Sequence, residues 1–157
     1  MTTRNVVKIA TIAALYAVFT IFLVPISYGP IQFRVSEFFK IFVLYNPWLS
    51  IGIGIGTFFA NLASPYVGPL ELIWMPLTDI AGGVLAWKIF IILGNRFPTV
   101  PMVIYAGTTS LAVSIMLYIL GVGGIVLVAL SVFISEAIIL IGGIPLAKFI
   151  SQRVNLV

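Results

Sequence analysis

A run of apolar residues extends from Ile125 to Ile150, and Glu136 and Lys148 are its only charged side chains. A helix needs about 20 mostly apolar residues to cross the hydrocarbon core of a bilayer, so this run is long enough to span one. The rest of the chain is similar, because 62% of its 157 residues are hydrophobic and 8% are charged. Soluble domains are roughly 25% charged. The sequence therefore predicts an all-α integral membrane protein with a single domain over residues 1–157.

Several chemistries are excluded by residue types that the chain lacks. Cysteine and histidine are both absent, which removes disulfides, Cys/His metal sites and the imidazole base of hydrolytic triads. A Ser/Lys pair stays open as a catalytic arrangement, but we expect no enzyme, no catalytic residue, no metal and no cofactor in this chain. The eight basic residues are scattered along the sequence, so nucleic acid is not an expected partner.

Six apolar segments are separated by proline, glycine or charged residues: Ile9–Val24, Phe38–Tyr45, Trp48–Ala63, Leu70–Leu93, Met102–Leu120 and Ile125–Ile150. The second segment is too short to span a bilayer unless neighbouring helices shield it. An alternative joins Val35 to Ser64 in one long helix kinked at Pro47, which leaves five crossings.

The basic residues favour six crossings, because Lys and Arg in short loops stay on the cytoplasmic side. With a cytoplasmic N-terminus, six crossings leave Arg34 outside and place five basic residues inside: Arg4, Lys8, Arg96, Lys148 and Arg153. Five crossings would move Arg96, Lys148 and Arg153 outside. We therefore predict six transmembrane helices, the second one short, with both termini in the cytoplasm. A signal peptide over the first 29 residues is a less favoured alternative.

Small residues form ridges on two of the expected helices. In the third helix Gly52, Gly56, Ala60 and Ser64 recur every four residues, which favours packing inside the bundle. In the first helix the ridge consists of Ala10, Ala13, Ala14 and Ala17. Partner docking and internal packing explain this first ridge equally well.

Polar residues are scarce, yet in this topology several of them gather at the outer ends of the second, third and fourth helices: Gln32, Arg34, Glu37, Asn61 and Glu71. Ionisable residues at membrane depth usually have a function. With Phe33, Tyr66 and Trp74 available to stack on a flat ring, this set predicts an outward-facing site for a small polar aromatic ligand. The alternatives are a surface ion pair between Arg34 and Glu37, and a helix N-terminal role for Glu71.

Two further acids, Asp79 and Glu136, lie deeper in the expected fourth and sixth helices and need a partner or a proton. We expect Asp79 to pair with Lys40 or to form the floor of the site, and Glu136 to make a polar contact across the bundle. A proton relay through these two acids is a bolder alternative.

Four motifs, in this order, carry a resemblance that covers nearly the whole chain: "GPIQFRVSEFFKI", "GIGIGTFFANL", "GPLELIW" and "SEAIILIGGIPLAK". The chain resembles the QueT family of queuosine-precursor transporters, which are substrate-binding (S) components of energy-coupling factor (ECF) importers. The first motif is the most specific. The matched polar positions are Gln32, Arg34, Ser36, Glu37, Asn61, Glu71 and Glu136.

The resemblance implies an outward-facing site for a 7-deazaguanine, a location in the plasma membrane, and partners that include a transmembrane coupling (T) protein and two ATPase subunits that use ATP. It also implies that these partners dock on the alanine face of the first helix. Glu37 or Glu71 would accept hydrogen bonds from the ring N–H and amine, and Gln32 or Asn61 would donate to the carbonyl. The chain departs from the family pattern at Glu71, where the family commonly has Asp, and at Trp74 and Met75 in place of a Phe-Gly pair; it departs again at Pro76 and Asp79. An S component for another heterocycle or vitamin is therefore an alternative. A membrane scaffold is a more distant one.

Overall fold

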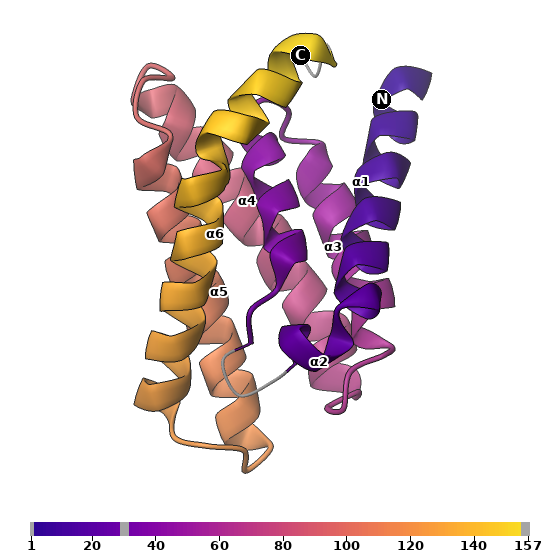
Figure 1. Cartoon of the computed structure of the whole chain (residues 1–157), viewed down its shortest axis with the longest axis vertical. Helices are drawn as coiled ribbons and strands as arrows, with labels where there is room; N and C mark the ends of the chain where they lie inside the picture. Colours follow the sequence, from indigo (N-terminus) through magenta and orange to yellow (C-terminus); the bar gives the residue numbers. More distant parts are fainter. Residues whose placement is uncertain (1, 29–31, 155–157) are drawn as a thin grey trace.

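The computed structural model describes residues 2–28 and 32–154, and every regular element in these ranges is helical. The first three residues of the "GPIQFRVSE" stretch lie outside the described residues. Figure 1 shows the elements in order: α1 (Thr3–Phe22), α2 (Val24–Ser27), η1 (Val35–Leu44), α3 (Leu49–Asn61), η2 (Leu70–Trp74), α4 (Met75–Ile92), α5 (Thr99–Ile119) and α6 (Ile125–Arg153). The predicted all-helical membrane bundle is therefore confirmed.

Four helical stretches of the described chain are long and apolar enough to cross a membrane: Thr3–Phe22, Leu70–Ile92, Thr99–Ile119 and Ile125–Arg153. The α3 helix is apolar but has 13 residues. All six apolar segments read from the sequence thus appear as helices, and four of them have full spanning length. The start of α1 and the end of α6 lie at the same end of the bundle (Figure 1), which we call the terminus end.

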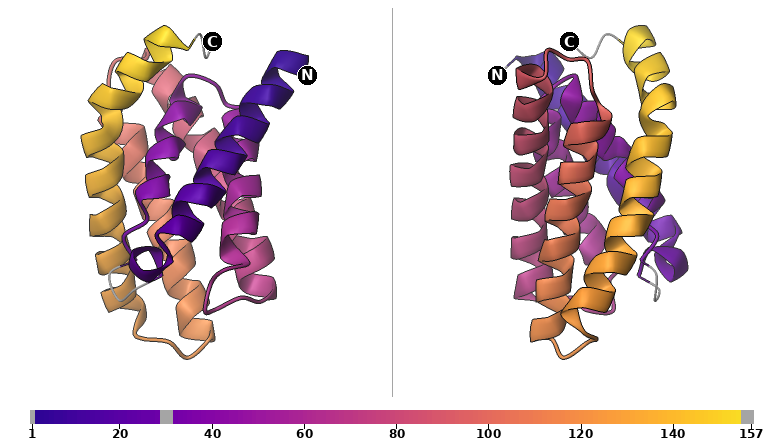
Figure 2. Two further views of the ribbon diagram at one scale, coloured as in Figure 1. Left: turned by 45° about the vertical axis from the view of Figure 1, so that its right-hand side comes forward. Right: turned by 90° about the vertical axis from the view of Figure 1, so that its left-hand side faces the viewer.

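The alternative long helix from Val35 to Ser64 does not form. The η1 helix ends at Leu44, and the chain then turns before α3 begins at Leu49. In this turn the side-chain oxygen of Asn46 accepts a hydrogen bond from the Trp48 backbone N–H at 3.1 Å. Figures 1 and 2 show that α3 runs back along the bundle after this turn.

The η1 helix is a ten-residue 3₁₀ helix rather than an α-helix. A 3₁₀ helix rises about 2.0 Å per residue and aligns residues three apart, and it rarely continues beyond about four residues. Glu37 and Lys40 therefore lie one above the other on the same side of η1. Because α1, α3, α4 and α6 all contact η1, its charged side chains are enclosed by the longer helices.

Glycines allow α1 and α3 to approach closely. A Cβ atom on Gly52 would lie 2.7 Å from the Ile9 backbone oxygen, and one on Gly56 would lie 2.9 Å from the Ala13 oxygen. Both distances are shorter than van der Waals contact, so residues with a side chain do not fit there. The predicted internal packing of the third helix is confirmed.

The alanine ridge of α1 is divided between two surroundings. Ala13 and Ala17 are buried, whereas Ala10 and Ala14 are exposed. The buried pair shares its helix face with Ile9 and Tyr16, which contact the α3 glycines. Internal packing thus accounts for half of this ridge, and partner docking stays a prediction for the exposed half.

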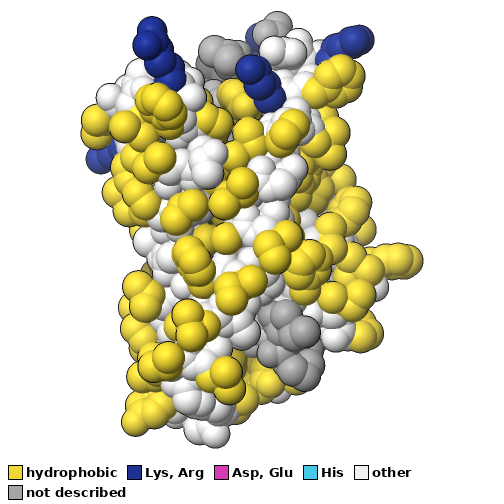
Figure 3. Space-filling model, turned by 60° about the vertical axis from the view of Figure 1, so that its left-hand side comes forward, with side chains coloured by type: hydrophobic (Ala, Val, Ile, Leu, Met, Phe, Trp, Pro, Cys, Tyr) yellow, Lys and Arg dark blue, Asp and Glu magenta, His cyan; other side chains and the backbone are white. Residues whose placement is uncertain are grey.

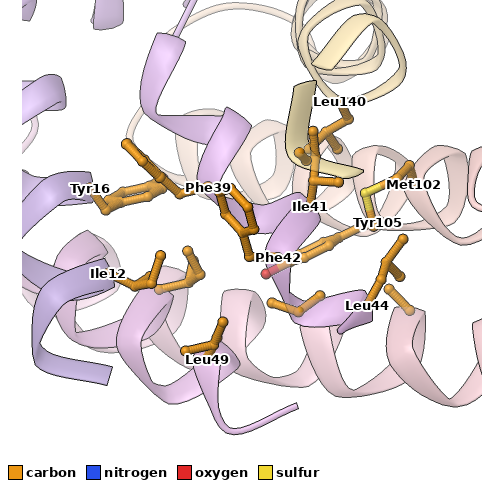
Figure 4. Packing of buried hydrophobic residues seen from close by; sticks show 14 of the residues in the cluster. Ile12, Tyr16, Phe39, Ile41, Phe42, Leu44, Leu49, Met102, Tyr105 and Leu140 are labelled. Carbon is orange, nitrogen blue, oxygen red and sulfur yellow. The ribbon is translucent and has the colours of Figure 1, made fainter. Parts of the chain in front are cut away.

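Large apolar side chains fill the bundle between the polar cluster described below and the terminus end. Figure 4 shows Ile41 and Leu44 of η1 packed among Leu49, Met102 and Leu140, which belong to α3, α5 and α6. Each of these side chains is buried. This core closes the terminus half of the molecule.

Candidate functional site

The most buried charge in the described chain belongs to Lys40, whose side chain is inaccessible to solvent. Its ammonium nitrogen lies 2.5 Å from Glu37 Oε2, 2.8 Å from Asp79 Oδ1 and 2.9 Å from Glu136 Oε1. It also donates a hydrogen bond to Thr109 Oγ1 at 3.1 Å. The expected Lys40–Asp79 pair and the expected polar contact of Glu136 across the bundle are both confirmed.

Hydroxyl groups from three other helices complete this cluster. Tyr16 of α1 donates to Glu37 Oε1 at 2.6 Å, and Thr57 of α3 donates to Asp79 Oδ2 at 2.6 Å. Tyr105 of α5 donates to the Asp79 backbone oxygen at 2.6 Å, and its ring lies 4.8 Å from the Lys40 nitrogen. Buried charges persist only when paired and hydrogen-bonded, and here every large helix contributes one partner or more.

The balance of charge in this cluster is negative. Three carboxylates face Lys40, and the nearby Arg34 is the second cationic group, with 7% of its surface exposed. With all five groups ionised, one negative charge remains in excess. An excess charge in an apolar bundle is costly, so either one acid of the cluster keeps a proton or the cluster takes up an additional positive charge.

A cavity opens above this cluster, toward the end of the bundle opposite the termini. Its volume is about 240 Å³, and its lining includes Tyr28, Gln32, Tyr66, Ser131 and Val132. A smaller space of about 10 Å³, room for a single water molecule, shares Gln32 and Val132 with it. The smaller space is also lined by Arg34, Glu37, Thr109 and Glu136. Glu37 and Glu136 therefore lie between Lys40 and the cavity.

Arg34 is held at the edge of this space by the segment that precedes η1. Its guanidinium carbon lies 4.6 Å from the centre of the Tyr28 ring, and its Nε donates to the Ser27 backbone oxygen at 3.4 Å. A cation over an aromatic ring is stabilised by the quadrupole of the ring. Arg34 and Glu37 are both buried, so the interpretation as a surface ion pair is wrong.

A second polar cluster lies beside the cavity, around Asn61. The Asn61 amide donates to the Glu71 backbone oxygen at 2.9 Å, and its oxygen accepts from the Tyr28 hydroxyl at 2.9 Å. Ser64 donates to Glu71 Oε1 at 2.7 Å. Burial raises the pKa of the Tyr28 phenol to about 12. This cluster fixes α2 against α3 and η2, and through the Tyr28 ring it supports Arg34.

The structure brings together four of the predicted site residues and places the other four elsewhere. Gln32, Arg34, Glu37 and Glu136 line one space. Asp79 lies behind them against Lys40. Asn61 and Glu71 are buried in the second cluster, and Trp74 is exposed on the surface of the bundle.

Other residues of the site were not among the predicted ligand contacts. Lys40 appeared there as a possible partner of Asp79 alone, although the 3₁₀ spacing puts it directly below Glu37. Tyr28, Thr109 and Ser131 carry no motif, and their place at the cavity follows from the way the helices pack. Tyr66, in the loop after α3, also lines the cavity, and the sequence analysis had named it as an aromatic residue that could stack on a ring.

The site is suited to binding rather than to bond making. It offers carboxylate acceptors, an amide, a guanidinium and aromatic walls, the groups that orient a small polar ring in a pocket. Within the described residues no group of His, Cys, Asp and Glu side chains is arranged to hold a metal ion. Lys40 occupies the centre of the three carboxylates instead.

Comparisons with known proteins identify the family of this chain. Residues 6–152 match the family described as the QueT transporter. A relative from Lactococcus lactis subsp. cremoris (strain MG1363), described as "Queuosine precursor transporter QueT", is 37% identical over 94 residues, which is 59% of this chain and 50% of the relative. The match thus spans half of the length of that relative, and no solved structure matches the chain. With its apolar helices, the chain is a multi-pass protein of the plasma membrane, and it belongs to the QueT transporter family.

Proposed function

We propose that this chain is the substrate-capture (S) component of an ECF-type importer, and that it binds a queuosine precursor of the 7-deazaguanine class on the extracytoplasmic side. In this proposal six helices cross the membrane and the terminus end faces the cytoplasm. The observation that carries it is the cavity of about 240 Å³, together with the adjoining small space that is lined by Gln32, Arg34, Glu37 and Glu136. Membership of the QueT family supports the ligand class.

The chemistry of the cavity matches both edges of a deazaguanine. The ring N–H and exocyclic amine are donors that a carboxylate accepts in a two-point contact, so Glu37 or Glu136 takes this edge. Gln32 and Arg34 donate to the carbonyl, while Tyr28 and Tyr66 flank the ring. Glu71, the other acid considered for this role, lies in the neighbouring cluster and supports Asn61 and Tyr28 from there.

With all three acids ionised, the excess negative charge would favour a precursor that carries an aminomethyl cation over a neutral cyano or free-base form. An ammonium placed near Glu37 and Glu136 would balance the charge of the Lys40 cluster. A neutral ligand would leave that charge in place. A competition experiment with the two ligand forms measures this preference directly.

Energy for transport would come from partner proteins: a coupling protein and two ATPase subunits. The glycine-rich stretch that begins at Gly52 is not followed by Lys, and it lies inside α3, so it is not a phosphate-binding loop. Ala10 and Ala14 are the exposed small residues of α1, and a partner helix can approach closely there.

Ligand binding to the purified full-length chain tests the proposal. We expect 7-aminomethyl-7-deazaguanine to bind more tightly than guanine, folate or thiamin, and to raise the unfolding temperature by mass action. The variant Gln32→Ala should weaken binding by about tenfold or more, because it leaves buried polar groups unpaired. The matched control is Gln152→Ala, at an exposed position near the end of α6.

Two results would redirect the proposal. Binding of a different heterocycle in the same panel, with the same loss in Gln32→Ala, would keep the transport role and change the ligand. Absence of any ligand response, together with no ATPase pair in co-purification from native membranes, would favour a membrane scaffold.

A further inference from the structure

The ammonium group of Lys40 is surrounded by more acceptors than it has donors. A lysine ammonium carries three N–H groups, yet four side-chain oxygen atoms lie within 3.1 Å of this nitrogen. They belong to Glu37, Asp79, Glu136 and Thr109. At least one of these oxygens therefore shares a donor or receives none from Lys40.

The three acids of the cluster differ in their other contacts. Glu37 and Asp79 each face Lys40 with one oxygen and accept a hydrogen bond from a hydroxyl group with the other. Glu136 faces Lys40 with Oε1, whereas its Oε2 accepts no hydrogen bond from the residues that the structure describes. Because accepted hydrogen bonds favour the ionised form of a carboxyl group, Glu136 is the acid best suited to keep a proton.

The charge of the cluster is balanced when one acid is protonated. All four acidic residues of the chain are buried, and the face drawn in Figure 3 shows Lys and Arg side chains but no Asp or Glu. The charged and titratable groups around Glu136 are Tyr16 of α1, Arg34, Glu37 and Lys40 in or next to η1, Asp79 of α4 and Tyr105 of α5. Both phenols donate hydrogen bonds and are therefore neutral. Three acids then face two cations, and one proton removes the excess charge.

Glu136 also lies where water from the ligand cavity can reach it. It lines the space of about 10 Å³ that has room for one water molecule and that shares Gln32 and Val132 with the cavity. Asp79 is not among the residues that line either space. A proton that leaves Glu136 can therefore pass through this water to the solvent in the cavity.

We propose that Glu136 holds a proton while the cavity is empty and releases it when a ligand that carries an ammonium group binds. The O–H bond of the carboxyl group breaks, the proton leaves through the cavity to bulk water, and the carboxylate pairs with the cation of the ligand. This inference rests on the function proposed above. A cationic ligand exchanges with one proton, so its affinity rises with pH by up to about tenfold per pH unit, whereas a neutral ligand binds without this exchange.

Isothermal titration calorimetry of the full-length chain, in two buffers with different heats of ionisation, counts the released protons. We expect about one proton for each 7-aminomethyl-7-deazaguanine bound and none for 7-cyano-7-deazaguanine. Glu136→Gln keeps an oxygen that can face Lys40 but has no acid proton, so it should release none with either ligand. The matched control is Gln152→Glu, the reverse exchange at an exposed position, which should behave like the unmodified chain.

Infrared spectroscopy of the ligand-free chain tests the proton without any ligand. A protonated carboxyl group has a C=O band that an ionised carboxylate lacks, and we expect Glu136→Gln to remove one such band. Asp79 is the single aspartate of the chain. Isotopic labelling of the glutamate carboxyl carbons should therefore shift this band, whereas labelling of the aspartate should not, and this measurement needs no variant.

The outcomes separate this inference from the proposed function. Binding of the aminomethyl form without proton release, equal release with both forms, or a band that Glu136→Gln leaves in place would overturn the proton exchange and keep the ligand class. Binding of neither form would show that the ligand class is wrong, and the exchange would be overturned with it.

Discussion

Lys40 is the residue on which the polar interior depends. One ammonium group contacts carboxylates from η1, α4 and α6, and the acids in turn accept hydrogen bonds from α1 and α3. Buried ion clusters contribute little net stability compared with apolar packing, but they are very sensitive to the loss of a single member. Removing Lys40 would leave three carboxylates facing one another in an apolar surrounding.

We therefore expect Lys40→Met, which preserves the length of the side chain, to destabilise the folded protein by about 3–5 kcal/mol. Thermal unfolding in detergent measures this effect, and Lys88→Met on the exposed face of α4 is the control. Adding Glu136→Gln to Lys40→Met should recover part of the loss, because it removes one of the unpaired charges. A Lys40→Met protein as stable as the control would contradict the assigned role.

Tyr28 provides a pH-dependent prediction. Burial raises the pKa of its phenol to about 12 in the folded state, whereas an exposed tyrosine has a pKa near 10. Between these two values the folded chain holds a proton that the unfolded chain releases, so stability falls as the pH rises. Denaturation at pH 9 and pH 11 should show this fall, and Tyr28→Phe should reduce it.

The elements differ in how far the sequence could predict them. The long apolar runs predicted α4, α5 and α6 to within a few residues, because hydropathy and length are sufficient for a spanning helix. The 3₁₀ geometry of η1 and the π-helical turn at Leu70–Trp74 have no hydropathy signal. In η2 the Met75 N–H donates to the Leu70 oxygen, five residues earlier, which accommodates Pro76 in the next turn.

The candidate site was likewise predicted from the sequence only in part. Scarcity of charge correctly singled out Asp79 and Glu136 as residues that need partners. Lys40 was predicted as a partner of Asp79 alone, because the sequence does not show that η1, α4 and α6 converge on one ammonium group. The place of Glu71 in the neighbouring cluster, where it accepts a hydrogen bond from Ser64, was likewise not predicted.

At the element scale, the close contact of α1 and α3 predicts that alanine substitutions at two glycines differ in their effect on stability. Gly56→Ala should destabilise the bundle by about 1–3 kcal/mol, because the added carbon would overlap backbone of α1. Gly107→Ala in α5 is the matched control, since nothing lies within 4 Å of its added carbon. Equal unfolding temperatures for the two variants would show that α1 and α3 are not in close contact.

At the scale of the whole molecule, the absence of cysteine allows the proposed orientation to be tested without background labelling. Thr3→Cys and Thr99→Cys lie toward the terminus end, and Val67→Cys lies in the loop between α3 and η2 at the opposite end. In intact cells a membrane-impermeant thiol reagent should label Val67→Cys alone. Labelling of Thr3→Cys before lysis would invert the orientation.

The core drawn in Figure 4 has a consequence for how a solute would travel. Below the floor of acids, Ile41, Leu44, Leu49 and Met102 block the way with contiguous hydrocarbon. In this conformation the cavity is therefore closed toward the terminus end, and a bound solute can leave only toward the opposite end of the bundle. Passage of a solute to the terminus end would require that the helices move apart or that the whole bundle changes its tilt.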